Sequence, residues 1–191
     1  MADTVPENLD DIINELRGAV NDATATAGFA GFGLRKLTEF IMANVRPNAV
    51  NQDPTIFLGI GDPNDPASEQ YSAWRRSEAL DQIRRNGPVD DRIGQQWIVM
   101  LYARWDEEFR LRLARAYGCD ARDIKVPLLG DLRKLRHGVV HNKGKSYGYG
   151  DVLHWFGVDE PITLRGKHYA EFHRRFPWDD LRVGPSTGAT A

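Results

Sequence analysis

Cysteine, long apolar runs and an excess of either charge are all scarce in this sequence of 191 residues. The lone cysteine, Cys119, excludes an intrachain disulfide and a zinc site built from paired cysteines. No apolar run approaches the ~18 residues of a membrane span, so no membrane partner is expected. The net charge of −2 argues against a nucleic-acid-coating protein, which needs a broad basic surface. Residues 1–11 are acidic where a secretory signal would be basic, which predicts a cytoplasmic protein.

Residues able to do chemistry are concentrated in one stretch, residues 130–144. Asp131 is suited to cap the start of a helix there, and Gly144 to follow its end. Three apolar residues between them recur at helical spacing and predict one buried stripe: Leu132, Leu135 and Val139. Basic residues outnumber acidic ones in and just after the stretch, so local positive charge is available for weak, salt-sensitive capture of RNA.

The polar side of this predicted helix carries two imidazoles beside two guanidiniums. At about 100° per residue, Arg133, His137 and His141 fall on successive turns of one face. Arg136 falls between that face and the apolar stripe. Imidazole gives and takes protons near neutral pH, and guanidinium is a permanent donor fork shaped for phosphate oxygens. RNA carries its own nucleophile, the 2'-hydroxyl, so these groups suffice to cleave it without a metal or other cofactor.

Arg136, His137 and His141 also match the signature of the HEPN superfamily, in which an arginine and a polar residue are followed after a short gap by a histidine. The flanking segments add to the match. Trp-Asp-Glu-Glu-Phe-Arg at 105–110 and Leu-His-Trp-Phe-Gly-Val at 153–158 resemble what surrounds the motif in prokaryotic members. The resemblance covers residues 70–178.

The resemblance implies an all-α, HEPN-like helical bundle and a metal-independent RNA endonuclease that acts as a toxin or defence effector. Members of the family form homodimers whose two signature helices line one cleft. His141 is the candidate for proton transfer, Arg136 for holding the scissile phosphate, and His137 for orienting His141 or binding phosphate. If the protein is a toxin, an antitoxin or another partner protein is expected to mask the cleft.

Three residues beside the motif are expected to bind the RNA substrate: Arg133, Asn142 and Lys143. On an undistorted helix, Arg136 and His141 project about 140° apart, so one helix does not easily aim both at one phosphate. A two-fold axis would let the arginine of one copy meet the histidine of the other, which predicts a composite site. Asp106, Glu107 and Glu108 are candidates for an acid that supports the arginine.

Three alternatives remain open. His137 and His141 have the spacing of a zinc-binding HExxH pair, with His154 or His168 as a third ligand, but Gly138 stands where that motif has its glutamate. A purely structural alternative has Arg136 paired with an acid and the histidines as ordinary surface residues. A third is a HEPN-like module that binds nucleotide, RNA or a partner protein without cutting.

Four segments are expected along the chain. Residues 1–46 form a helical extension packed on the bundle, residues 47–69 an irregular loop, residues 70–178 the HEPN-like domain, and residues 184–191 a disordered tail. The loop contains one segment apolar enough for a strand or a buried loop, Thr55–Ile60.

Within the extension, helices are expected at residues 6–20 and 34–45. Gly28, Gly31 and Gly33 lie between them and predict a flexible turn. A phosphate-binding loop is disfavoured because the Walker spacing is absent and no strand precedes the glycines.

Further helices are expected at residues 68–85 and 89–117. The second is predicted to be the central core helix, because apolar residues recur every four positions: Ile93, Trp97, Leu101, Trp105, Phe109 and Leu113. Such a repeat drifts by about 40° per step, so the helix should contact partners around much of its circumference. A small C-terminal β-hairpin of residues 152–156 and 161–164 and a last helix at 168–176 complete the expected fold.

Overall fold

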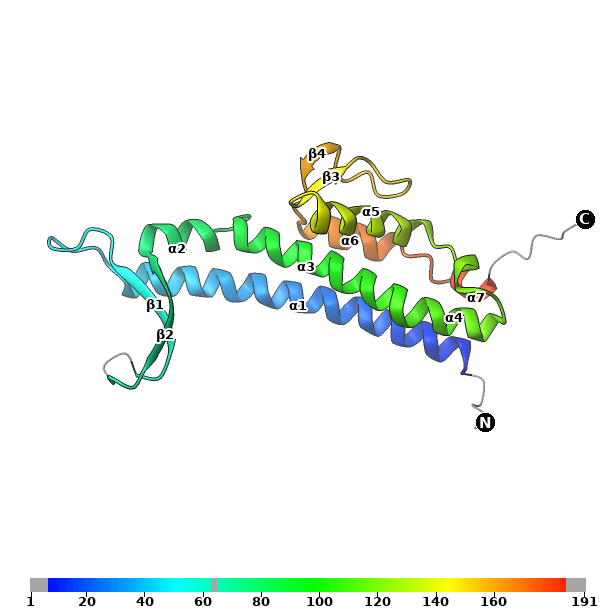
Figure 1. The fold of residues 1–191 in the computed structure, drawn as a ribbon, viewed down its shortest axis with the longest axis horizontal. Helices are drawn as coiled ribbons and strands as arrows, with labels where there is room; N and C mark the ends of the chain where they lie inside the picture. The colour runs from blue at the N-terminus through cyan, green and yellow to red at the C-terminus, as the bar shows by residue number, and fades with distance from the viewer. Residues whose placement is uncertain (1–6, 63–64, 185–191) are drawn as a thin grey trace, which may run out of the picture. The chain divides into compact units, whose positions relative to one another are not determined.

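The computed structural model describes residues 7–62 and 65–184 (Figure 1). The chain is mainly helical and contains two small antiparallel sheets of two strands each. It divides into two compact units. The larger unit comprises residues 1–27 and 94–191, and the smaller unit comprises residues 28–93. No helix among the described residues is both long and apolar enough to cross a membrane.

The first helix, α1 (Leu9–Asn44), is longer than either helix expected in this region. Asn8 precedes it and accepts a hydrogen bond from the Asp10 backbone N–H at 3.0 Å, which satisfies one of the free donors at the helix start. The helix continues through residues 21–33, so the predicted flexible turn is wrong. Alanine is frequent in this stretch, and its high helix propensity offsets the cost of about 1 kcal/mol for each glycine.

The predicted central helix is confirmed, with one addition. Helix α3 (Pro88–Arg104) passes through a π-helical turn, η1 (Trp105–Phe109), into α4 (Arg110–Tyr117). A π-turn accommodates about one more residue than an α-turn, so it counteracts the drift of the four-residue repeat. Trp97 and Trp105 are each 3% exposed, which confirms that both belong to the core.

Helix α5 (Pro127–His141) carries the motif. Pro127 occupies the first helical turn, where its missing N–H costs nothing. The helix therefore starts before Asp131, and the prediction that Asp131 caps it is wrong. Leu132 and Leu135 are buried and Val139 is partly buried against the core, which confirms the apolar stripe.

The core of the larger unit lies between four helical segments. The part of α1 up to Ala27 runs antiparallel to the α3–η1–α4 rod, and α5 and α6 (Gly166–Arg175) pack onto them (Figure 1). The last helix is confirmed, since residues 168–175 are helical. A short 3₁₀ turn, η2 (Ala121–Asp123), precedes α5, and α7 (Asp180–Val183) ends the described chain. Residues 185–191 of the expected tail lie outside the described residues.

The C-terminal sheet forms from other residues than expected. Strand β3 (Lys145–Tyr147) pairs antiparallel with β4 (Val158–Pro161), so the predicted strands at 152–156 and 161–164 are wrong. The apolar residues that suggested them instead lie in irregular segments that enter the core directly: Leu153, Phe156, Ile162 and Leu164. The Asp131 carboxylate binds the backbone N–H groups of 151–153, which removes them from sheet pairing.

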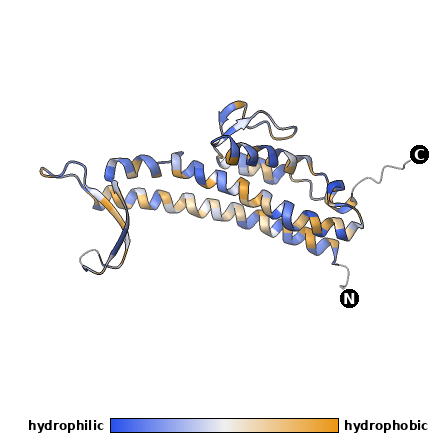
Figure 2. Cartoon of the chain, viewed as in Figure 1, coloured by the Kyte–Doolittle hydropathy of each residue, from blue (hydrophilic) through white to orange (hydrophobic). Residues whose placement is uncertain are grey.

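In the smaller unit, β1 (Thr55–Ile60) confirms the strand expected there. It pairs antiparallel with β2 (Glu69–Arg75), which is followed by α2 (Arg76–Ile83). The helix expected at 68–85 is therefore wrong in its first half, because Tyr71 and Trp74 fit a pleated strand and Trp74 stands opposite Ile56. Orange, hydrophobic positions run along this hairpin in Figure 2.

Candidate functional site

A buried carboxylate fixes the position of α5. Asp131 is 1% exposed and accepts the backbone N–H groups of Asp151, Val152 and Leu153 at 2.8, 2.6 and 2.8 Å. Burial alone would raise the pKa of Asp131, but the three backbone donors, with Lys134 nearby, hold that pKa below its ordinary value. The carboxylate is therefore ionised at neutral pH and ties the loop after β3 to the helix.

A glycine lets α5 approach β3 closely. A Cβ added at Gly138 would lie 2.4 Å from the Lys145 carbonyl oxygen and 2.9 Å from Ile162 Cδ1. Only a residue without a side chain fits there. A zinc protease of the HExxH type needs a glutamate at this position as its general base. The side chain of a glutamate would have no space here, so the structure disfavours that alternative.

The two motif histidines form an exposed pair on this face of α5. Their ring centroids are 4.7 Å apart, and the His137 ring also lies 5.1 Å from the ring of Tyr147 on β3. His137, His141 and Tyr147 are all exposed. The resulting imidazole pair, His137 and His141, is held one turn apart with both rings open to a ligand.

Arg136 lies against a different element. Its guanidinium carbon lies 5.8 Å from the centre of the Tyr102 ring on α3, a cation–π contact. Its Nε is buried without a hydrogen-bond partner. A buried unsatisfied donor is costly, so an anion that came to lie beside this nitrogen would remove that cost.

One of the three candidate acids, Asp106, acts on the tyrosine that Arg136 contacts. An ion pair of 3.0 Å joins Asp106 to Arg110, and the negative charge of Asp106 acts on the Tyr102 hydroxyl. Burial first, and Asp106 second, raise the pKa of Tyr102 above its ordinary value. Asp106 and Arg136 thus have Tyr102 as a common neighbour. Within the described part of the chain, no carboxylate forms an ion pair with Arg136, so the alternative of a simple structural pair lacks its partner.

The other two candidate acids point elsewhere. Glu107 is exposed, and Glu108 pairs with Arg104 at 3.3 Å and with Arg112 at 3.2 Å. Arg112 also binds Glu7 and Glu15, so Glu108 belongs to a separate surface network along α1 and α4.

The expected RNA-binding residues flank the imidazole pair. Arg133 is exposed, one turn before His137. Lys143 is exposed in the turn after α5, at a φ of +52° that few residues other than glycine adopt. Asn142 is half-buried and donates from Nδ2 to the Lys145 carbonyl at 3.2 Å, so one of its amide donors already serves the turn.

Metal ligation finds no support in this geometry. Across residues 7–62 and 65–184, no group of three or more His, Cys, Asp or Glu side chains is arranged to hold a metal ion. The proposed third ligands have other surroundings. His168 is buried and accepts the Arg165 backbone N–H at Nδ1, and the His154 ring lies 6.4 Å from that of Tyr149.

Two tyrosines of the site, Tyr102 and Tyr147, were not predicted from the sequence. The four-residue spacing of Tyr102 and Asp106 is a signal that a polar contact crosses the apolar stripe of the central helix. Nothing in the spacing of Tyr147 indicates its stacking on His137, because it depends on the approach of β3 to Gly138.

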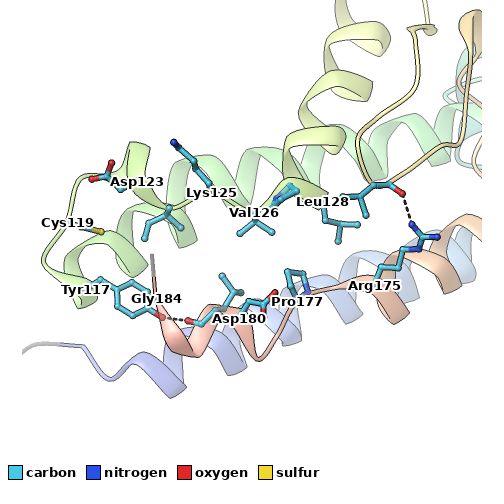
Figure 3. A pocket seen from close by; sticks show the side chains of 14 residues that line it. Tyr117, Cys119, Asp123, Lys125, Val126, Leu128, Arg175, Pro177, Asp180 and Gly184 are labelled. Atoms are coloured by element: carbon cyan, nitrogen blue, oxygen red, sulfur yellow. Dashed lines mark hydrogen bonds between the residues drawn. The ribbon is translucent and has the colours of Figure 1, made fainter. Parts of the chain in front are cut away.

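A large cavity lies elsewhere in the larger unit. It has a volume of about 820 Å³ and is bordered by η2, the start of α5 and α7 (Figure 3). Arg175 crosses one side and donates to the Val152 carbonyl, and Tyr117 donates to the Leu181 carbonyl at the other. None of the motif residues lines it.

Comparison of the chain with protein-family models, curated proteins and solved structures finds no match.

Proposed function

We propose that this protein is a metal-independent RNA endonuclease of HEPN type, acting at a cleft that two copies build together. The observation that carries the proposal is the arrangement on α5. Two exposed imidazoles lie 4.7 Å apart, and the neighbouring Arg136 has a buried Nε without a partner. Proton-transfer groups and a cation that can bind the phosphate are what cleavage of a phosphodiester requires.

The reaction uses the RNA's own nucleophile. His141 takes the proton from the 2'-hydroxyl, and the 2' oxygen attacks phosphorus. The bond from phosphorus to the 5' oxygen breaks, and a protonated imidazole, which we assign to His137, returns a proton to that leaving oxygen. Arg136 binds the charge that grows on the non-bridging phosphate oxygens. The products are a 2',3'-cyclic phosphate and a 5'-hydroxyl, with no metal or cofactor consumed.

The different surroundings of these groups support a composite site. Arg136 rests on Tyr102 of α3, while the imidazole pair rests on Tyr147 of β3. With the projection of about 140° between Arg136 and His141, one chain has no direct route that joins them on one phosphate. Two copies related by a two-fold axis can place the arginine of one beside the imidazoles of the other.

Cleavage of structured and unstructured RNA in EDTA tests the proposal. We expect the wild type to cut in chelator and to leave cyclic-phosphate ends, and Arg136→Ala and His141→Ala each to lose at least ~100-fold in rate, the usual worth of such groups. Lys134→Ala serves as the control, because Lys134 is bound to Asp151 rather than to the imidazole pair. Cleavage that requires added zinc, or that survives in both variants, would contradict the proposal.

The position of Arg136 favours one other function. Its guanidinium is already partly withdrawn against Tyr102, which suits a HEPN-like module that binds RNA, nucleotide or a partner protein without cutting. A wild type that binds RNA and leaves it intact, with binding lost in Arg136→Ala, would select this second function. A role as toxin or defence effector, with a protein that masks the cleft, belongs to the endonuclease proposal alone.

A further inference from the structure

The smaller unit has almost no core of its own. Among its described residues, Ile41 is the one hydrophobic residue that is buried, whereas the core cluster of the larger unit contains none of residues 28–93. A segment of this size needs buried apolar surface to offset the entropy of ordering its backbone. Its apolar residues are present, but they lie at the surface.

One set of these residues lies on α1. Phe29 and Phe40 are 76% and 60% exposed. At about 100° per residue, Phe29, Phe32 and Phe40 point to one side of the helix and the buried Ile41 points to another. A helix that is apolar on two sides is normally covered on both, but this second face of α1 has no partner among residues 7–62 and 65–184.

A second set lies on the β1–β2 hairpin. Trp74 stands opposite Ile56, and Leu58 and Ile60 continue the apolar positions along β1. Leu58 and Ile60 are 46% and 70% exposed. A two-stranded hairpin is only marginally stable alone, and each of its outer edges presents unpaired backbone groups. This hairpin therefore has both an apolar face and free edges for another strand.

We propose that the smaller unit is a self-association surface, covered by the smaller unit of a second copy of this chain. The area is sufficient. With about 200 Å² for each fully exposed large side chain, the residues of these two faces leave roughly 700 Å² of apolar surface in water. A standard stable interface buries ~800 Å² per partner, of which a little over half is apolar. The residues are Phe29, Phe32, Phe40, Leu58, Ile60 and Trp74.

The charge of this unit favours a second copy over other occupants. Residues 28–93 contain eight Lys and Arg and nine Asp and Glu, so 8 − 9 gives a net charge of −1. Two identical surfaces of nearly zero charge do not repel each other. An anionic membrane or RNA would be recognised by an excess of basic residues, which this unit does not have. The inference does not depend on the endonuclease proposal.

Sedimentation equilibrium on the full chain tests this surface. We expect a wild-type mass of twice 21.6 kDa at micromolar concentration. The double variant Phe29→Glu with Phe40→Glu should raise the dimer dissociation constant at least ~100-fold. The matched control is Met100→Glu with Leu111→Glu. It places the same charges at exposed apolar positions of α3 and α4 in the larger unit, 63% and 45% exposed, and should leave the constant within threefold.

A second variant, Ile60→Lys on the hairpin, tests the same surface if Phe29→Glu with Phe40→Glu prevents the protein from folding. It should weaken the dimer at least tenfold while the circular dichroism spectrum stays unchanged. A monomeric wild type at ~100 μM, far above the constants of specific dimers, would overturn the inference. So would folded variants of α1 and the hairpin that dimerise as tightly as the wild type, or a control pair that weakens the dimer equally.

Discussion

At the scale of single residues, Asp131 shows how a charge inside the protein can be structural. Three backbone N–H groups surround its carboxylate. Gly150 makes space for the carboxylate, because a Cβ at that position would lie 2.3 Å from it. A carboxylate with several backbone donors is stabilised in its charged form. Its function is to hold the loop at 151–153 on the helix that carries the imidazole pair.

Asp131→Asn should lower the free energy of unfolding by about 1–3 kcal/mol, because an amide turns a donor toward backbone donors and leaves one of them unsatisfied. Urea unfolding at pH 7 measures this. Asp151→Asn is the control, since the Asp151 side chain is 80% exposed and pairs with the surface residue Lys134. Equal midpoints for Asp131→Asn and the wild type would contradict the structural role.

Acid stability gives a second measure of the same group. The pKa of Asp131 is lower in the folded protein than its ordinary value of 3.8. The unfolded chain therefore takes up this proton first as the pH falls, and the stability that Asp131 contributes is complete above pH 3.8 and lost below it. The Asp131→Asn variant should lose less stability than the wild type over that acid range.

Two glycines of α5 give opposite predictions. Gly138→Ala should cost about 1–3 kcal/mol of stability by overpacking against Lys145 and Ile162. Gly130→Ala should add about 0.5–1 kcal/mol by restricting the unfolded chain, because a Cβ at Gly130 meets nothing within 4 Å. Urea midpoints of the two variants measure both. A stabilising Gly138→Ala would show that α5 does not need its close approach to β3.

At the scale of elements, α6 is anchored by two histidines that must be neutral. The His168 Nδ1 accepts the Arg165 backbone N–H at 2.9 Å, and the His173 Nε2 shares a hydrogen bond of 2.9 Å with the Thr24 hydroxyl on α1. Burial lowers the pKa of each below the ordinary value of 6.5. The folded chain therefore favours the neutral form of each imidazole.

The stability of the larger unit should fall as the pH drops from 7 to 5. Below pH 6.5 the unfolded chain binds protons at these positions that the folded chain resists, so acid favours unfolding. Urea midpoints across this range measure the effect, and His168→Gln with His173→Gln should flatten the profile. A wild-type profile that is already flat, or one unchanged in the double variant, would contradict this role of α6.

Some elements could be predicted from the sequence and others could not, for physical reasons. The four-residue repeat through Trp97 and Leu101 is strong enough to predict the central helix, but the π-turn depends on what packs around Trp105. Pro127 was a better helix start than Asp131, whose partners lie in a loop far along the chain. Long-range contacts of this kind leave no local pattern.

The same distinction applies to the candidate site. The imidazole pair follows from the spacing of His137 and His141 along one helix, because residues four apart share a face. The surroundings of Arg136 do not follow from spacing, since Tyr102 reaches it from another helix. Sequence thus predicts which groups share α5, and tertiary packing decides which neighbours each one has.

At the scale of the whole molecule, the composite site and the self-association surface are separate proposals that both require two copies. Placing charged residues on the apolar surface of the smaller unit should therefore lower the rate of RNA cleavage in parallel with the fraction of dimer. We expect Phe29→Glu with Phe40→Glu to cleave slowly at low protein concentration and to regain rate as concentration rises. Full RNA-cleaving activity in a variant shown to be monomeric would contradict the composite site, because that site needs residues from two copies.

The most direct measurement mixes two inactive proteins, Arg136→Ala and His141→Ala, under conditions that exchange subunits. Random pairing makes about half of the dimers mixed, and each mixed dimer has one site with both residues intact, if the site is built across the two-fold axis. RNA cleavage should then return to about a quarter of the wild-type rate. Activity that stays at the level of the separate variants, with mixed dimers shown to form, would contradict a site shared between two copies.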